Sequence, residues 1–310
     1  MRKTSAVLAS LSLAVLALTG CTAVSSEASP ACDRSADDAG IRDAVTVEGP
    51  IGQTPDVSVF APLQLTKSAV ADATVGDGRQ IVDDTQGLVA EISIFRGDTG
   101  EQIFATSYDK NRGQISTAAH WAQQSPGLAT VFDCATAGTR IVAGLTPEDF
   151  GENNVQGFGL DPDTNVVFVI DVVDVFLDRA EGTLQFNDAK GMPTVVRASD
   201  GTPGIIIPDA AAPTKQQMQT LIKGDGDPVT ADQLPLVNVM AVGWDDKQVI
   251  SNTWEQTFSV DLASSAPTVA EALVGQPVGS QVLVVTPAAD GAPAVAYVVD
   301  ILGAVTAPTQ

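Results

Sequence analysis

The chain carries an internal duplication, and a repeat of domain length constrains the fold more strongly than any single motif. The triplet Gly-Asp-Gly at 76–78 begins 13 residues before Val89, and the same triplet at 224–226 begins 13 residues before Val237. Further matching anchors follow in the same order: Phe104–Tyr108 with Ile250–Trp254, Leu128 with Val269, Gly138 with Gly279, and Phe168–Asp171 with Tyr297–Asp300. The sequence therefore predicts two copies of one domain, at 45–176 and 192–305.

Short apolar segments rich in β-branched residues recur in both copies, bounded by Gly, Asp and Pro. Segments of this kind are typical of strands in a sheet that is covered on at least one face. The expected strands are 89–95, 141–145 and 166–175 in the first copy, and 237–242, 282–285 and 294–302 in the second. Two stretches that contain Ala and Leu, 126–134 and 267–275, predict one short helix per copy. The expected fold class is α+β, and mostly β.

The N-terminal residues resemble a bacterial lipoprotein signal. Arg2 and Lys3 precede an apolar run over 6–18 that is too short to span a bilayer, and the sequence Leu-Thr-Gly-Cys ends at Cys21. The resemblance implies cleavage before Cys21 and diacylation of its thiol. Residues 1–20 are then a signal peptide, and the protein is lipid-anchored to the cell membrane on its extracytoplasmic face. An uncleaved membrane helix is the alternative.

The segments outside the two copies are expected to be connections. Residues 21–44 are rich in Ser, Ala and Asp and have no sustained apolar periodicity, which predicts a flexible stalk. Residues 177–191 are expected to form a linker between the copies, and 306–310 a short tail.

The chain is strongly acidic, with 16 Lys and Arg residues against 38 Asp and Glu residues and a net charge of −22. Such a charge repels nucleic acid and anionic lipid head groups. The sequence also contains no glycine-rich phosphate loop of the usual form. Neither nucleic acid nor a nucleotide is therefore expected as a partner, and no cofactor is expected.

Two cysteines, Cys32 and Cys134, remain when Cys21 carries lipid. In an exported protein an even pair of cysteines indicates a disulfide. The bridge would close a loop of about 100 residues, which contributes roughly 4–5 kcal/mol in the chain-entropy model. Two free thiols are the alternative.

Metal and nucleophilic chemistry find little support in the sequence. His120 is the only histidine, which excludes zinc sites built from several histidines and leaves one chance for a Ser-His-Asp arrangement. Neighbouring carboxylates such as Asp83 and Asp84 point in opposite directions on an extended segment, so they make a poor acid–base couple. No metal site is expected.

The repeated anchors resemble the FKBP-type peptidyl-prolyl cis/trans isomerases, and in particular tandem FKBP-like lipoproteins of actinobacterial type. In order, they are Gly-Asp-Gly, a strand, "FATSY" or "ISNTW", a helix running into "ALVGQPVGSQVLVVTP", and a closing "VVFVIDVVDV" or "VAYVVDILG". The resemblance covers nearly all of both copies and is most specific over 272–287. It implies two tandem domains, each a twisted antiparallel sheet wrapped on one short helix, with proline-containing polypeptides as partners.

Such an isomerase needs no nucleophile. Rotation about an X-Pro bond faces a barrier of about 18–20 kcal/mol because amide resonance must be broken. An apolar pocket lined by aromatic side chains lowers this barrier by desolvating the amide and holding it twisted. The resemblance assigns the pocket of the first copy to Phe104, Leu128, Phe150 and Phe168, and the second-copy equivalents to Ile250, Val269 and Tyr297.

Both pockets depart from the family pattern. Ala105 and Leu128 stand where the family has polar and indole groups. The connection that overhangs the family pocket spans 30 residues from Gly138 to Phe168, against 18 from Gly279 to Tyr297. We therefore expect isomerase activity to be weak and to lie in the first copy.

Three interpretations stay open at this stage. The first is an exported isomerase with eroded sites; the competing interpretation of its four pocket residues is that they belong to the core, as buried Phe and Leu usually do. The second is a non-catalytic chaperone or protein-binding lipoprotein that kept the FKBP fold. The third, a purely structural cell-wall lipoprotein, predicts no affinity for proline peptides.

Overall fold

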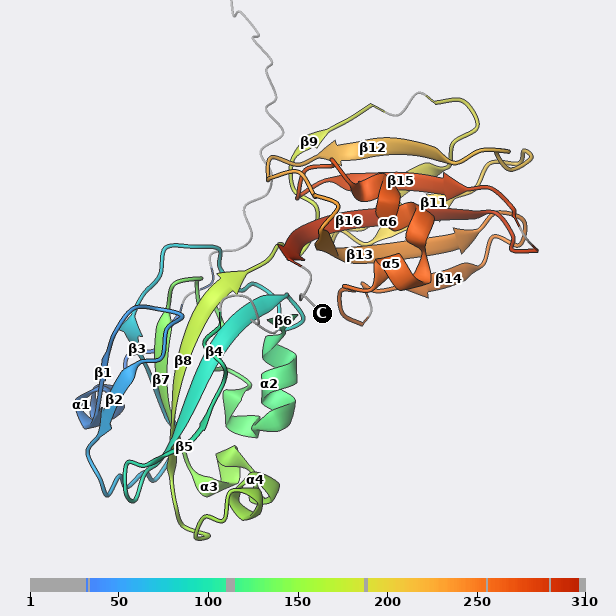
Figure 1. Ribbon diagram of the computed structural model, residues 1–310. Helices are drawn as coiled ribbons and strands as arrows, with labels where there is room; N and C mark the ends of the chain where they lie inside the picture. Colours follow the sequence, from blue (N-terminus) through green and yellow to red (C-terminus); the bar gives the residue numbers. More distant parts are fainter. Residues whose placement is uncertain are drawn as a thin grey trace, which may run out of the picture. The chain divides into compact units, whose positions relative to one another are not determined.

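Two six-stranded antiparallel sheets form the framework of the described chain (Figure 1). A computed structural model describes residue 32 and residues 34–109, 115–186, 189–254, 256–289 and 291–306. The predicted signal peptide, Cys21 and most of the tail lie outside the described residues. All the elements below belong to one unit, Asp33–Gln310. The prediction of a mostly β fold with few helices is confirmed.

The first copy contains a sheet with the strand order β3-β7-β8-β4-β5, and β6 pairs with β4. Its strands are β3 (Ala69–Thr74), β4 (Leu88–Arg96), β5 (Gln102–Ala105), β6 (Ile115–Ser116), β7 (Arg140–Leu145) and β8 (Val166–Val175). The helices of this copy are α1 (Ala39–Ala44), α2 (Ala118–Gln124), the short 3-10 helix η1 (Pro126–Leu128), α3 (Pro147–Phe150) and α4 (Glu152–Gly157). A separate hairpin consists of β1 (Val45–Glu48) and β2 (Asp56–Val59).

The second copy contains a sheet with the order β14-β13-β16-β15-β12-β9. Its strands are β9 (Thr183–Leu184), β12 (Gln217–Lys223), β13 (Gln233–Gly243), β14 (Val249–Asn252), β15 (Gln281–Thr286) and β16 (Val295–Thr306). The remaining elements are the hairpin of β10 (Thr194–Arg197) with β11 (Pro203–Ile206), and the helices α5 (Leu262–Ser265) and α6 (Pro267–Leu273).

The two sheets share one topology. Numbered along the chain, the five main strands of each copy lie in the spatial order 1-4-5-2-3. A β-bulge also recurs at the equivalent place, at Val173 in β8, opposite Val89 and Ala90, and at Leu302 in β16, opposite Leu236 and Val237. Because a bulge twists and bends the strand that carries it, both sheets are shaped in the same way at this point.

The Gly-Asp-Gly triplets mark a close approach between two segments. A Cβ atom on Gly76 would lie 2.1 Å from the carbonyl oxygen of Ala137, and one on Gly224 would lie 2.2 Å from that of Val278. Only glycine therefore fits at the first position of each triplet. This contact gives the repeated motif a structural reason in both copies.

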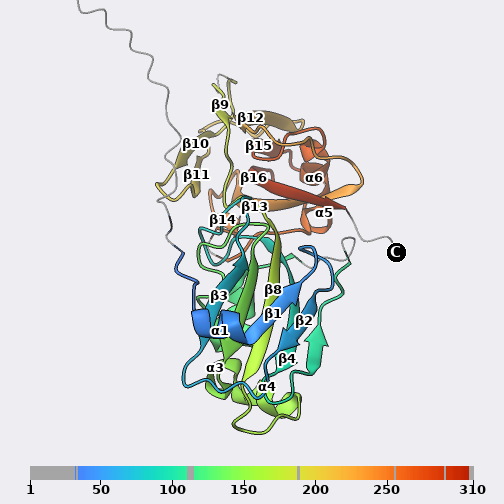
Figure 2. The same ribbon diagram turned by 90° about the vertical axis from the view of Figure 1, so that its left-hand side faces the viewer.

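Each sheet is covered on both faces (Figure 2). In the first copy one face packs against α2, η1, α3 and α4, and the other against α1 and the β1–β2 hairpin. In the second copy α5 and α6 cover one face and the β10–β11 hairpin covers the other. This double coverage explains why β8 and β13 are buried along most of their length instead of alternating.

The structure contains all six expected strands, with β8 at its predicted bounds and the ends of the other five differing by up to four residues, but the helix of the first copy lies elsewhere. The stretch 126–134, expected as the helix of the first copy, holds only η1, and the longer helix α2 precedes it at Ala118–Gln124. In α2 only Ala118 is fully buried, so this helix has almost no apolar periodicity that the sequence could reveal. The helix expected at 267–275 is present as α6.

The flexible stalk was predicted too long, and the prediction is wrong for residues 34–44. Arg34 forms hydrogen bonds of 2.7 and 2.8 Å with Asp72 on β3, and Ile41 in α1 is 1% exposed in the core. One buried apolar residue on a six-residue helix leaves no periodic signal. The predicted linker 177–191 is likewise structured in part, because it contributes β9 to the second sheet and buries Leu177.

Within the described residues, no helix has both the length and the apolar character that crossing a membrane requires.

Candidate functional site

Three of the four residues assigned to the first-copy pocket meet in the core. Leu128, Phe150 and Phe168 are exposed by 1, 1 and 2%, and all three belong to one buried cluster between the sheet and its helices. The rings of Phe150 and Phe168 pack edge to face, with centroids 5.8 Å apart. Side chains buried to this degree contact other protein groups and cannot contact a substrate.

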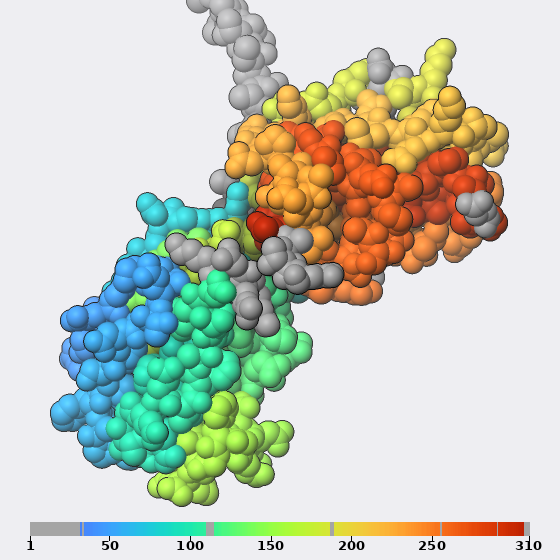
Figure 3. Space-filling model, in the orientation of Figure 1, coloured from blue at the N-terminus to red at the C-terminus, as the bar shows by residue number. Residues whose placement is uncertain are grey.

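The long connection of the first copy closes over these residues instead of overhanging an open pocket. In Figure 3 its segment with α3 and α4, coloured yellow-green, covers one end of the first copy. Asn154 in α4 donates hydrogen bonds to the carbonyls of Phe150 and Gln124, at 2.6 and 2.7 Å, and so ties the segment to the end of α2. A Cβ atom on Gly127 would lie 2.7 Å from Cβ of Asp149, so η1 and α3 are in tight contact.

Phe104, the fourth assigned residue, lies apart from this cluster. It is on the edge strand β5, and its side chain is 38% exposed. Tyr108 ends the same "FATSY" anchor, and its hydroxyl lies 2.9 Å from Oγ of Ser93 on β4. Burial raises the pKa of Tyr108 to about 12, so its phenol stays neutral at physiological pH.

In the second copy the register shows that the predicted equivalents were shifted by one residue on one strand. Phe104 pairs with Ile94 in β4, and the corresponding pair in β13 and β14 is Ala241 with Ser251. Ser251 is therefore the equivalent of Phe104, and the assignment of Ile250 was wrong. The chain between the Gly-Asp-Gly triplet and the residues opposite the bulge is one residue shorter in the second copy, which displaces every later position on β13 and β14.

The other two second-copy assignments lie together. Val269 on α6 is 0% exposed, and Tyr297 on β16 packs against the same cluster but stays half-buried. Burial raises the pKa of Tyr297, and a hydrogen bond with Thr286 opposes the shift. The described part of the β15–β16 connection carries no helix. Tyr297 is therefore less covered than Phe168, which holds the matching position in the first copy.

A buried carboxylate occupies the centre of the second sheet. Asp300 on β16 is 1% exposed and accepts hydrogen bonds from Nε2 of Gln281 at 2.7 Å and from the backbone N–H of Ala180 at 2.8 Å. Arg197 binds the oxygen of the same Gln281 side chain. Burial raises the pKa of Asp300 to about 6, although these donors and Arg197 act in the opposite direction.

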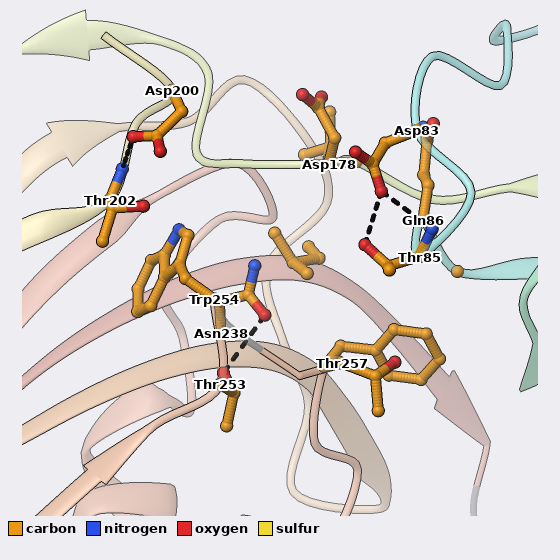
Figure 4. Close-up of a pocket in the computed structure, with 14 residues that line it drawn as sticks. Asp83, Thr85, Gln86, Asp178, Asp200, Thr202, Asn238, Thr253, Trp254 and Thr257 are labelled. Atoms are coloured by element: carbon orange, nitrogen blue, oxygen red, sulfur yellow. Dashed lines mark hydrogen bonds between the residues drawn. The ribbon is translucent and has the colours of Figure 1, made fainter. Parts of the chain in front are cut away.

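A cavity of about 210 Å³ lies away from all the assigned pocket residues. Figure 4 shows the turn of Asp200 and the turn of Asp83 at opposite ends of the view, with Trp254 and Asn238 between them. Leu177, Leu302 and Phe258 contribute apolar surface, and the rest of the lining is polar: Thr85, Gln86, Gly87, Asp178, Thr202, Thr253 and Thr257.

Sequence reasoning did not identify this cavity as a site. Its lining comes from segments that are far apart along the chain, from Asp83 to Leu302, and no motif links them. One signal was available, because Trp254 closes the "ISNTW" anchor of the repeat.

Among the described side chains, no group of three or more His, Cys, Asp or Glu residues has the arrangement to hold a metal ion. His120 in α2 stacks edge to face on Trp121, with ring centroids 5.7 Å apart. Cys32 and Cys134 are both disulfide-bonded.

Comparison with known proteins finds similarity in solved structures alone. No family model matches the chain. No curated protein matches it either. The three FKBP domains of wheat FKBP73 are 14% identical, over 77% of this chain and 94% of that one, with a TM-score of 0.34.

Two bacterial structures are similar over a shorter part of the chain. FkpA from Escherichia coli is 20% identical, over 35% of this chain and 47% of that one, with a TM-score of 0.29. A peptidyl-prolyl cis-trans isomerase from Pseudomonas syringae is 15% identical, over 35% of this chain and 74% of that one, with a TM-score of 0.29. The three structures named here are thus those of FKBP proteins and of a peptidyl-prolyl isomerase.

Proposed function

We propose that the chain is a lipid-anchored, FKBP-like protein that binds polypeptides on the extracytoplasmic face of the membrane, without isomerase activity in its first copy. The observation that carries this proposal is the packing of Phe150 on Phe168, both at most 2% exposed. An isomerase of this class must admit a proline ring to an apolar pocket. Here the protein's own side chains fill the assigned position.

Polypeptide binding is supported by the exposed edges of the two sheets. The equivalent edge strands β5 and β14 carry exposed apolar side chains, with Phe104 at 38%, Val249 at 61% and Ile250 at 58%. An edge strand offers unpaired backbone groups to an extended peptide, and apolar side chains beside it add contact area. The sequence resemblance to FKBP proteins favours the same class of partner.

A second candidate function is weak isomerase activity in the second copy. Tyr297 supports it, because this aromatic side chain packs against the same cluster as Val269 but is only half-buried, and the described part of the β15–β16 connection adds no helix like α3 or α4. Any isomerase activity would then lie in the second copy, whereas the sequence predicts it in the first.

The proposal is tested on the full mature chain carrying Cys21→Ser. We expect it to suppress aggregation of an unfolded client protein and to leave the isomerisation rate of a proline tetrapeptide at its spontaneous value. If the rate rises, the matched variants Tyr297→Leu and Phe168→Leu identify the copy. Loss of activity in Tyr297→Leu alone supports the second candidate. Loss in a folded Phe168→Leu variant alone contradicts the proposed first-copy closure.

A further inference from the structure

The cavity beside Trp254 is lined by negative charge. Its three ionisable side chains are Asp83, Asp178 and Asp200, and no Lys, Arg or His is among its described lining residues. Arg179 stands outside the lining, with its Nε 3.9 Å from a carboxylate oxygen of Asp178. One arginine offsets only part of three carboxylates. A concave surface lined by one sign of charge concentrates the potential and attracts ions of the opposite sign.

Two of these carboxylates are held in place by their own turns. Oδ1 of Asp83 accepts hydrogen bonds from the backbone N–H and the hydroxyl of Thr85, at 2.8 and 2.5 Å. Oδ1 of Asp200 accepts from the backbone N–H of Thr202 at 3.0 Å. The hydrogen bonds from Thr202 lower the pKa of Asp200, which keeps it ionised at neutral pH. In both turns the backbone N–H two residues on donates to Oδ1, which fixes the orientation of the carboxylate.

The remaining wall supplies aromatic and apolar surface. Trp254 and Phe258 provide ring faces, and Leu177 and Leu302 provide aliphatic surface. Nε1 of Trp254 is shielded from solvent and has no hydrogen-bond partner among the described residues. An aromatic face within about 6 Å of an ammonium or guanidinium group attracts it, and apolar walls accommodate the alkyl stem of such a side chain.

The size of the cavity limits what it can hold. Its volume of about 210 Å³ is below the roughly 300–1,000 Å³ of sites that enclose a whole small-molecule ligand. We propose that this cavity receives one lysine or arginine side chain of a bound polypeptide, an inference that rests on the proposed polypeptide binding. One of the lining carboxylates pairs with the cationic end, the others add to the negative potential, and Trp254 and Phe258 contact the stem.

The test follows the indole N–H resonance of Trp254, identified by its loss in Trp254→Phe, in the full mature chain with Cys21→Ser. The probes are the capped tripeptides Ala-Lys-Ala and Ala-Arg-Ala, with Ala-norleucine-Ala as the uncharged control. We expect the cationic peptides to shift the resonance and the norleucine peptide to leave it unchanged. We also expect Asp178→Asn and Asp200→Asn each to raise the Kd about two- to five-fold, the scale of a partly exposed ion pair. Asp163→Asn removes an exposed carboxylate elsewhere and should not change the Kd.

The outcomes separate this inference from the proposed function. An equal response to the norleucine peptide, or no response to any peptide, overturns the cation site. An equal loss of affinity in Asp163→Asn overturns it as well, because the effect is then that of net charge. If the protein still suppresses client aggregation in any of these cases, the proposed function stands while the cavity inference fails. Loss of client suppression in the unmutated mature chain contradicts the proposed function itself.

Discussion

Arg140 and Asp171 form a buried ion pair across β7 and β8, with Nε to Oδ1 at 2.6 Å and Nη2 to Oδ2 at 2.7 Å. The two side chains are 3 and 0% exposed. Arg140 also donates to the carbonyls of Gly49 and Pro50, and Asp171 accepts from the N–H of Gly52. The pair therefore fastens the loop between β1 and β2 to the first sheet. The second sheet has Gln281 opposite Asp300 in the same register.

We expect Asp171→Asn to lower the free energy of unfolding by about 3–5 kcal/mol, because removing one partner leaves a buried charge uncompensated. The matched control is Asp300→Asn, which faces the neutral Gln281 and should change stability much less. Urea unfolding of both variants measures the difference. A loss below about 1 kcal/mol in Asp171→Asn would show that water or a rearranged loop solvates Arg140.

Asp300 should make stability depend on pH. Burial raises its pKa from 3.8 to about 6, so the folded protein binds this proton more tightly than the unfolded chain does. The stabilising contribution is complete below about pH 4 and is lost as the pH rises through about 6. A shift of about two units corresponds to at most about 3 kcal/mol. Urea midpoints between pH 4 and 8 measure this slope, and Asp300→Asn should remove it; an unchanged slope assigns it to another group.

Phe150 should behave as a core residue. Phe150→Ala leaves a cavity and should lower the free energy of unfolding by about 3–5 kcal/mol. Phe104→Ala, at the exposed edge strand, should change it by no more than about 0.5 kcal/mol. Thermal unfolding of the two variants provides the comparison. Equal and small effects would place Phe150 at an open pocket.

Because Cys32 and Cys134 are disulfide-bonded, neither should carry a free thiol. Thiol titration of the unfolded, unreduced protein with Cys21→Ser should detect no free thiol. Reduction should lower stability by roughly 4–5 kcal/mol in the chain-entropy model, since the closed loop is about 100 residues long. Two titratable thiols before reduction would contradict the bridge.

Cys21 should determine membrane retention. Cys21→Ser should release unlipidated protein or leave the precursor uncleaved, because the lipid is attached through this thiol. Fractionation of cells that express the variant measures the result, with Cys134→Ser as a control that removes a different cysteine. A cleaved Cys21→Ser protein that stays on the membrane would contradict a lipid anchor.

Elements that are buried on both faces were predictable from the sequence. β8 was predicted at its observed bounds, 166–175, because burial on both faces requires a mostly apolar run, here broken only by Asp171 and Asp174. The helix α2 was not predicted, since a helix with one fully buried residue leaves no periodic pattern in the sequence. The register of β14 was predicted one residue out. An alignment of the two copies by residue type cannot show that the second copy is one residue shorter between its Gly-Asp-Gly triplet and the residues opposite the bulge.

The sequence by itself determined the duplicated β architecture, because glycine contacts and buried strands require particular residue types at particular spacings. It also placed Leu128, Phe150 and Phe168 near one another. Only the tertiary structure decided that they form a closed core, because the closure consists of contacts between residues distant in sequence, such as that of Asn154 in α4 with Gln124 at the end of α2. The cavity beside Trp254 was likewise decided in three dimensions, because its lining converges from segments with no shared pattern.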